Sequence, residues 1–311
     1  MSPAPDKDRD SRHSAPISLH HVRRLFAVPA RSERSQFLRR EISGRMFERL
    51  SLVRANPAHV LDAGCGEGDD LMSLAQAFPQ ARLLGVDAAA PMLMRARERS
   101  QQAGSGMRRL LHRWLRPAVA AHAPQLACAD FGRLPLGSSS VDLLWSNLAL
   151  HWHPQAHHVL REWARILRVE GLLMFSAFGP DTFRELREAY VSLGVIPPVL
   201  PFVDLHDYGD MMVEAGFADP VMDMEKLNIT YSSERDLLAD VRSFGGNPLT
   251  ERQAGLTGRS RSLALQNALE QQKDADGRIS LTIEVVYGHA FRALPKKTHA
   301  GEPIIHFTRR P

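Results

Sequence analysis

The chain has 311 residues, of which 44% are hydrophobic and 24% charged, the composition of an ordinary globular protein. A chain of this length buries about three quarters of its unfolded surface, so it needs no disulfide or metal to fold. Its two cysteines exclude an all-cysteine zinc site. No apolar run of about 18 residues is present, which argues against stable membrane insertion. The N-terminus lacks the apolar core of a secretory signal, so we expect a cytoplasmic protein.

Charge is unevenly distributed along the chain. The net charge is +4, but residues 1–56 hold twelve Lys and Arg against six Asp and Glu and therefore carry +6. A nucleic-acid binder would interleave basic and aromatic residues or contain a known recognition module, and neither is present, so we expect no nucleic-acid partner. A basic N-terminal face suits an acidic protein or a carboxylate substrate, and it is equally typical of a solvated helical surface.

The first 56 residues form two segments of different composition. Residues 1–16 are polar and contain three prolines, which predicts a disordered tail. Over residues 17–56 apolar side chains recur at spacings of three, four and seven among many Arg and Glu, which predicts helices. Pro57 ends this stretch, because the residue before a proline avoids the helical region.

From residue 57 onwards, apolar runs alternate with helical patterns. We expect strands at residues 59–62, 81–87, 126–130, 141–147, 171–178, 221–231 and 280–287. Helices are expected at residues 69–78, 91–102, 155–167, 182–193, 205–215 and 234–244, with a mobile loop over 245–259. Continuous apolar strands separated by helices indicate a parallel sheet covered on both faces. The prediction is therefore an α/β fold with an open, doubly wound sheet.

The segment from Gln101 to Gln125 is long for a connection between a helix and a strand. It places five Arg and His residues around Leu110, Leu111 and Trp114, which predicts a basic amphipathic helix inserted in the sheet scaffold. Such a helix covers the edge of the domain or contacts a partner or membrane surface.

A glycine-rich turn follows the first strand, in the segment Asp62-Ala63-Gly64-Cys65-Gly66-Glu67-Gly68. Glycines let a ligand approach the backbone closely, and such a turn marks a nucleotide-type site at the carboxyl end of a sheet. The GxGxG spacing is not the dinucleotide fingerprint, and no Gly-Lys-Ser/Thr follows. Acidic residues surround the turn and would repel a phosphate. A ligand with a cationic end and no phosphate, such as S-adenosylmethionine (SAM), suits them.

Polar residues end the next strands as well. Asp87 ends the second strand, where a carboxylate accepts from ribose hydroxyls or caps the following helix. Asp130 and Phe131 follow the third strand, where they suit an adenine amino group and ring, or where Asp130 caps a turn. Asn147 ends the fourth strand, at the same edge of the sheet, whereas Trp145 on that strand is expected in the core.

Together these residues resemble the class I SAM-dependent methyltransferases. The matching segments are VLDAGCGEG, LLGVD, ACADFGRLPLGSSSVDLLWSNLALHW and VLREWARILRVEGLLMFSAFG, from Val60 to Gly179. The resemblance implies a Rossmann-like, mostly parallel seven-stranded sheet and SAM as cofactor. It implies cofactor contacts from a set of strand-end and helix-start residues: Asp62, Gly64, Cys65, Gly66, Gly68, Asp87, Ala88, Met92, Asp130, Phe131, Asn147 and Leu148.

A narrower resemblance, over residues 20–290, is to the malonyl-[acyl-carrier protein] O-methyltransferases of biotin synthesis. It rests on WSNLALHW, FGPDTFRELR, DVRSFGGNP and LTIEVVYGHAF. It implies a helical lid at 17–56, a methyltransferase domain at 57–290 and a tail at 291–311. It also implies that the enzyme esterifies the free carboxylate of a malonyl group on acyl carrier protein. Methylation of another small molecule or quinone precursor, and a role as an assembly factor related to the complex I arginine hydroxylation factor, remain alternatives.

A carboxylate acceptor is already ionised at pH 7, so its methylation needs positioning and electrostatics rather than a general base. The sequence contains no Ser-His-Asp signature. A planar Arg is the preferred anchor for the carboxylate, and Arg184 and Arg187 follow the fifth strand. We expect one of them to bind the substrate, or both to pair with neighbouring glutamates, and His151 to line the acceptor side.

Two further expectations concern other polar residues. His153 and His157 have helical metal-pair spacing, but Pro154 separates them and no acid completes a HExxH pattern, so we expect no metal. Acyl carrier protein is acidic, so we expect a basic lid to attract it electrostatically. The lid residues named for this role are Arg23, Arg24, Arg31, Arg34, Arg39 and Arg40. The oligomeric state does not follow from the sequence.

Overall fold

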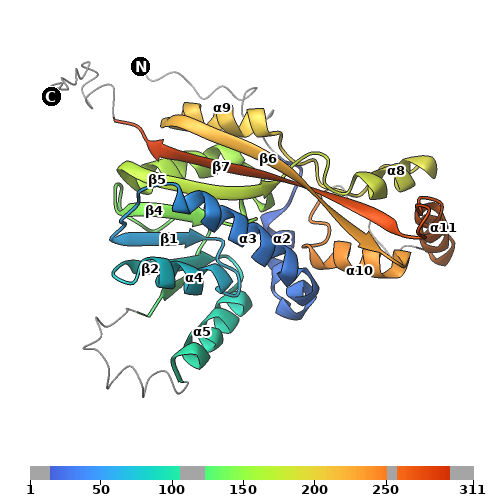
Figure 1. Ribbon diagram of the computed structural model, residues 1–311, viewed down its shortest axis with the longest axis horizontal. Helices are drawn as coiled ribbons and strands as arrows, with labels where there is room; N and C mark the ends of the chain where they lie inside the picture. The colour runs from blue at the N-terminus through green and yellow to red at the C-terminus, as the bar shows by residue number, and fades with distance from the viewer. Residues whose placement is uncertain (1–14, 106–122, 251–257, 295–311) are drawn as a thin grey trace.

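Seven strands form one sheet with helices on both faces in the computed structural model, which describes residues 15–105, 123–250 and 258–294 (Figure 1). The strand order is β3-β2-β1-β4-β5-β7-β6. The bounds are β1 (His59–Ala63), β2 (Arg82–Asp87), β3 (Gln125–Cys128), β4 (Val141–Ser146), β5 (Leu167–Phe178), β6 (Phe217–Tyr231) and β7 (Ile279–Arg292). The seven predicted strands are thus confirmed.

The sheet is mostly parallel. β3, β2, β1, β4 and β5 pair in parallel, and β7 lies antiparallel between β5 and β6. The chain moves outward from β1 to β3 and then returns to place β4 on the other side of β1. This reversal is the switch point at which open α/β sheets bind ligands beyond the carboxyl ends of their strands.

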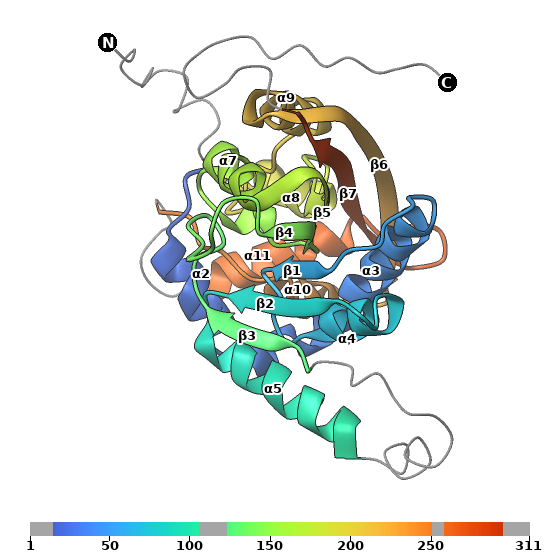
Figure 2. The same cartoon turned by 90° about the vertical axis from the view of Figure 1, so that its left-hand side faces the viewer.

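Helices cover both faces of the sheet, as the continuous apolar strands predict. Figure 2 shows α3 (Gln36–Ser51) and α4 (Asp69–Ala77) on one side and α7 (Ala156–Ile166) and α9 (Leu205–Ala215) on the other. α5 (Ala90–Ser105) packs against β2 and β3. Neighbouring strand residues belong to opposite core clusters, as side-chain alternation requires: Leu143 packs with α3 and α4, and Leu144 packs with α7 and α9.

The predicted N-terminal helices are confirmed as α2 (Leu19–Phe26), the 3-10 helix η1 (Pro29–Ser35) and α3. We call residues 17–51 the lid. α3 buries Leu38, Ile42 and Met46 against the sheet. The lid is also fixed to α10 (Glu234–Ser243), because Arg34 Nε donates to Asp240 at 2.7 Å and Ser35 Oγ donates to the carbonyl of residue 243 at 3.0 Å.

Three helices lie around the far ends of β6 and β7, which extend beyond the other strands (Figure 1). They are α8 (Arg184–Ser192), α10 and α11 (Arg259–Glu270). The sequence does not predict α11, because its fully buried residues, Leu265 and Leu269, are too few to give a clear helical stripe. It lies partly where a mobile loop is predicted; residues 251–257 of that loop lie outside the described residues.

Some predicted boundaries differ from the structure. β5 begins at Leu167, directly after α7, because Val141 of β4 already pairs with it ahead of a bulge. β7 continues to Arg292, two residues beyond the predicted domain end. Most of each predicted tail, 1–14 and 295–311, and most of the basic insert, 106–122, lie outside the described residues. No helix among the described residues is long and apolar enough to cross a membrane.

Candidate functional site

A cavity lies at the switch point, between the carboxyl ends of the strands and the lid. It holds about 880 Å³ of empty space, part of it open to solvent. Strand ends and the glycine turn supply its floor: Gly64, Gly66, Glu67, Asp87, Ala88, Ala89, Met92, Phe131, Asn147, Leu148, Ala149 and Phe178. The lid, the segment after β4 and the end of α10 supply its cover: Val22, Arg23, Phe26, Ser35, Leu38 and Arg39 from the lid, Trp152 from the segment after β4, and Ser243 and Phe244 from the end of α10. We call this the first cavity.

The glycine turn has the tight geometry that its sequence predicts. Gly64 has a φ of +84°, and a Cβ placed on it would come within 2.3 Å of the Ala149 Cβ. The N–H groups of Gly64 and Cys65 both donate to the carbonyl of Val86, at 2.8 and 3.0 Å. The turn therefore lies flat against β2, and its backbone faces the first cavity.

Asp87 links the turn to the next helix from the end of β2. One carboxylate oxygen accepts from the Gly66 N–H at 3.0 Å, and the other accepts from the Ala89 N–H at 2.8 Å. Burial raises the pKa of the Asp87 carboxyl, and these backbone donors oppose the rise. Each oxygen has a further lone pair, so the carboxylate can hold the turn and accept from a ligand hydroxyl as well.

Three predicted cofactor residues lie behind the turn rather than in the cavity lining. Asp62 is 1% exposed within β1, and its Oδ2 has no partner among the described residues. Burial, together with the charges of Asp70 and Asp87, raises the pKa of Asp62 well above its usual range. Cys65 is buried toward Gly85, and Gly68 caps α4 in a left-handed conformation. These residues shape the turn from below.

Most of the acidic residues around the turn are engaged by neighbouring helices. Glu67 and Asp69 both pair with Arg99 of α5. Asp70 accepts from Trp145 Nε1 at 2.8 Å and from Ser43 Oγ at 2.7 Å. Of the acidic residues named from the sequence, Glu67 and Asp87 line the first cavity. The negative field toward a ligand is therefore weaker than the sequence suggests.

Phe131 lines the first cavity, but its neighbour Asp130 is turned away from it. The Asp130 carboxylate accepts from the Gly132 N–H at 2.8 Å and lies 3.6 Å from Arg23 and 3.7 Å from His153 Nε2. Asp130 therefore caps a turn, which is one of the two roles that the sequence predicts for it. It also lies close to Arg23 of the lid.

Asn147 and Leu148 lie in the cavity, as predicted, and are held by β5. Ser176 Oγ donates to Asn147 Oδ1 at 2.9 Å and accepts from the Leu148 N–H at 3.0 Å. Asn147 Nδ2 donates to the carbonyl of Arg39 at 3.1 Å, which connects the strand end to the lid. Leu148 has a φ of +52°, an unfavourable value for a leucine that this network maintains.

Arg39, which the sequence predicts as part of a basic lid that attracts a carrier protein, lines the first cavity. It is half-buried, and its Nη1 donates to Ser35 Oγ at 2.7 Å. Burial lowers the pKa of Arg39, and the nearby carboxylates of Asp69 and Glu67 oppose the fall. Other lid arginines also have partners, since Arg34 bonds to Asp240 and Arg40 lies 3.6 Å from Asp69.

A second cavity adjoins the first and shares Trp152, Phe178 and Phe244 with it. It holds about 1040 Å³, part of it open to solvent. Its remaining lining is largely apolar: Phe183, Leu186, Tyr190, Pro198, Val199, Leu200, Phe202, Leu238, Val241, Arg242, Gly246, Asn247, Ser262 and Leu265.

His151 is buried beside both cavities and lines neither, which differs from the prediction. Its ring contacts Trp152, Phe178 and Phe202, and its Nδ1 accepts from the Phe178 N–H at 3.3 Å. Burial lowers the pKa of His151 to about 3, so the ring is neutral at physiological pH. It supports the aromatic wall between the cavities.

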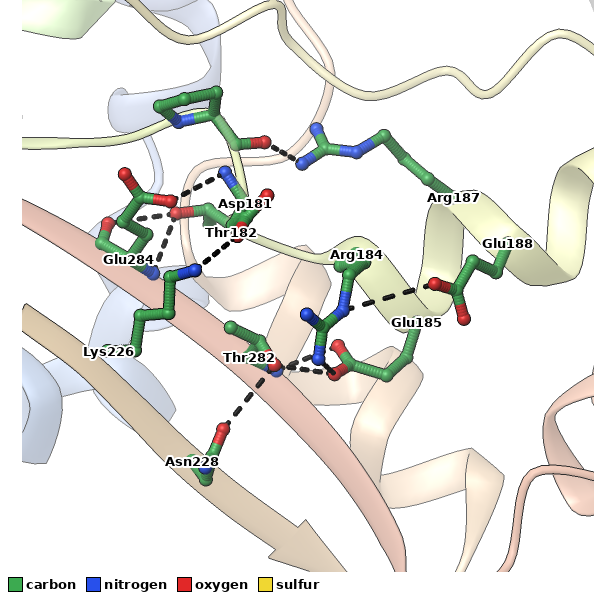
Figure 3. A network of polar contacts seen from close by, with 11 residues as sticks. Asp181, Thr182, Arg184, Glu185, Arg187, Glu188, Lys226, Asn228, Thr282 and Glu284 are labelled. Atoms are coloured by element: carbon green, nitrogen blue, oxygen red, sulfur yellow. Dashed lines mark hydrogen bonds and ion pairs between the residues drawn. The ribbon is translucent and has the colours of Figure 1, made fainter. Parts of the chain in front are cut away.

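Arg184 and Arg187 lie on α8, where Figure 3 shows their polar contacts. Neither residue lines the first or the second cavity. Arg184 pairs with Glu188 at 3.9 Å and with Glu185 at 3.5 Å, and Arg187 donates to the carbonyl of Pro180. For Arg184 this pairing with glutamates is the alternative that the sequence left open, whereas Arg187 bonds to a backbone carbonyl instead. The arginines that line the cavities are Arg23 and Arg39 in the first and Arg242 in the second.

Comparison with known proteins assigns the family. A methyltransferase domain family matches residues 61–175. A malonyl-[acyl-carrier protein] O-methyltransferase of Laribacter hongkongensis is 42% identical over 279 residues, 88% of this chain and 90% of that protein. The corresponding protein of Gallionella capsiferriformans is 39% identical over 93% of this chain and 96% of its own length. The chain belongs to the malonyl-[acyl-carrier protein] O-methyltransferase family.

Solved structures agree with the methyltransferase fold of this family. The YcgJ protein of Bacillus subtilis superposes with a TM-score of 0.57 and 15% identity, and covers 80% of this chain and 98% of its own. A putative methyltransferase of Bacillus halodurans superposes with a TM-score of 0.53 and 14% identity, and the match covers 81% of this chain and 99% of that chain. At these identities the likeness concerns the fold alone.

The family implies SAM as cofactor, and the first cavity fits it. Gly64 and Gly66 both line the cavity, and no atom lies within 4 Å of the place where a Cβ on Gly66 would be, so a ligand can lie against the turn. Carboxylates of Glu67 and Asp87 suit the cationic and hydroxyl groups of SAM, and Arg39 suits its carboxylate. Phe131 and Met92 provide apolar surface for the adenine ring.

Proposed function

We propose that this methyltransferase transfers a methyl group from SAM to the free carboxylate of a malonyl group carried on acyl carrier protein. A carboxylate oxygen forms the new C–O bond as the S–CH₃ bond breaks, so that a methyl ester and S-adenosylhomocysteine leave. The ester removes the charge from the malonyl end, as the first step toward pimeloyl in biotin synthesis. The observation that carries the proposal is a SAM-sized cavity beside the glycine turn that adjoins a second, mainly apolar cavity, in a chain of this family.

We assign the cofactor contacts from the geometry of the first cavity. Asp87 would accept from the ribose hydroxyls, and Phe131 would lie against the adenine ring. The backbone of Gly64 and Gly66 would lie along the methionine part, whose carboxylate would meet Arg39. Asp62, Cys65 and Gly68 would act on the cofactor indirectly, by fixing the turn.

The walls of the cavity favour this reaction without a general base. The bound cofactor supplies a sulfonium methyl group, and the acceptor is already an anion at pH 7. Opposite charges neutralise each other as the methyl group is transferred, so a poorly hydrated site lowers the barrier relative to water. Phe26, Leu38, Trp152 and Phe244 provide such surroundings, and Phe26 packs edge-on against Trp152 at 5.4 Å between ring centroids.

The anchor of the malonyl carboxylate remains a prediction. Arg184 and Arg187 lie on the first helix after β5, but their partners hold them away from both cavities. Arg23 is a better placed candidate, because it lines the first cavity and is half-exposed beside Asp130. A carrier attracted by the lid would use the outward arginines, Arg24 and Arg31, whose exposed side chains leave them available.

The test is a methyl-transfer assay with malonyl-acyl carrier protein, malonyl-CoA and unacylated holo-carrier as acceptors. Mass spectrometry should show the added mass of one methylene on the malonyl group, with preference for the carrier-bound substrate. SAM binding without transfer to any of the three would overturn the proposal and point to another acceptor or to an assembly role. We place the reaction in the cytoplasm, which a fractionation experiment would test.

A further inference from the structure

The second cavity is bounded by α8, α10, α11 and the segment at 194–204, and it adjoins the first cavity at an aromatic wall. Trp152, Phe178 and Phe244 belong to the linings of both. The outer side of the first cavity is covered by lid residues, including Val22 and Leu38. The second cavity therefore offers a substrate attached to a large protein an approach to the cofactor on the side away from these lid residues.

We propose that the second cavity holds the phosphopantetheine arm that carries the malonyl group, and that Arg242 at its rim binds the phosphodiester of that arm. This inference rests on the proposed function and names the path of its substrate. The cavity is mainly apolar but includes Asn247 and Tyr190 in its lining, which suits a chain of methylenes interrupted by amides.

Arg242 has the features of a phosphate ligand. It lies near the end of α10, its side chain is exposed, and it makes no hydrogen bond or ion pair with any described residue. It is close enough to Tyr190 for its positive charge to oppose the rise in the pKa of the phenol caused by burial. A guanidinium binds phosphate oxygens in a bidentate manner, and an unpaired one loses no protein partner in doing so.

The first experiment separates phosphate recognition from a general effect of charge. We would measure methyl transfer by Arg242→Ala with malonyl-carrier, malonyl-phosphopantetheine and malonyl-pantetheine, which lacks the phosphate. Arg235→Ala, on the same helix but outside the cavity lining, is the matched control. KM should rise about tenfold for the two phosphate-containing acceptors and stay unchanged for malonyl-pantetheine. An equal change for all three, or none, would overturn the role of Arg242.

The second experiment fills the cavity. Ser262→Trp places a large ring at its wall from a half-buried position on α11, and Leu263→Trp places the same ring on the exposed side of that helix. Ser262→Trp should lose transfer to malonyl-carrier while SAM affinity and the unfolding temperature match those of Leu263→Trp. Normal transfer by Ser262→Trp would refute the path. Failure of the unmodified enzyme to methylate malonyl-carrier would instead refute the proposed function.

Discussion

A methyl group added at Gly64 is the sharpest test of the first cavity. In Gly64→Ala the new Cβ would lie 2.3 Å from the Ala149 Cβ, whereas carbon atoms in contact are normally about 3.5–4.0 Å apart. Either the glycine turn or the segment after β4 must therefore move by about 1 Å. The left-handed φ of +84° adds about 1–2 kcal/mol for a residue with a side chain.

The two costs can be measured separately. The overlap contributes about 1–3 kcal/mol, in the range of other overpacked sites, so Gly64→Ala should lose about 2–5 kcal/mol of unfolding free energy and bind SAM at least about tenfold more weakly. Gly64→Ala/Ala149→Gly removes the overlap and keeps the backbone strain. Gly194→Ala, at a φ of +67° with no atoms within 4 Å, reports strain alone.

The measurements are denaturant unfolding and calorimetric titration with SAM. The double variant should regain the part of the loss that comes from the overlap, and Gly194→Ala should bind SAM normally. Wild-type SAM affinity in Gly64→Ala would refute the placement of the cofactor against this turn, and no recovery of stability in the double variant would refute the overlap with Ala149.

Three other substitutions test the electrostatics of the site. Arg39→Ala should weaken SAM binding, measured by calorimetry, about tenfold or more, because a partly buried charge-assisted hydrogen bond is worth about 1.5–3 kcal/mol. Arg187→Ala should leave SAM binding unchanged. Equal losses of affinity in the two variants would contradict our assignment of Arg39. The folded state raises the pKa of Asp62, so ionisation of this group lowers stability as pH rises above about 4. Asp62→Asn should therefore raise the unfolding temperature of the ligand-free enzyme more at pH 8 than at pH 5, and the reverse order would show that the carboxylate is stabilised. The folded state lowers the pKa of His151 to about 3, so protonation of the unfolded chain removes stability as pH falls below about 6.5. His151→Phe should flatten that fall in acid unfolding curves, and an unchanged slope would show that the buried ring is not the cause.

Strand ends were the most predictable part of the site. The GxGxG turn, Asp87, Phe131 and Asn147 lie near one another because carboxyl ends of parallel strands meet at one edge, and this follows from the sequence pattern alone. The same reasoning misplaced Asp62. Asp62 lies within the strand, before the turn, where successive side chains point to opposite faces of the sheet. Its side chain is buried in the core and does not point toward the cavity.

Residues that reach the site from distant elements could not be predicted in this way. Arg39 was read as part of a basic surface, since helix periodicity does not show which side faces a cofactor. Phe244 and Arg242 come from α10, about 200 residues after the lid that they approach. Only the three-dimensional packing of the lid against α10, through Arg34 and Asp240, brings these segments together.

The position of β7 has a consequence for how the protein is made. β7, the last strand of the described residues, lies between β5 and β6, and its pairing with β6 extends from Ile279 to Arg292. During synthesis β5 and β6 each keep an unpaired edge until β7 has left the ribosome, and exposed edges promote association with other chains. A chain truncated before Ile279 should therefore aggregate rather than form a smaller methyltransferase, and SAM binding should report that β7 has been made and paired.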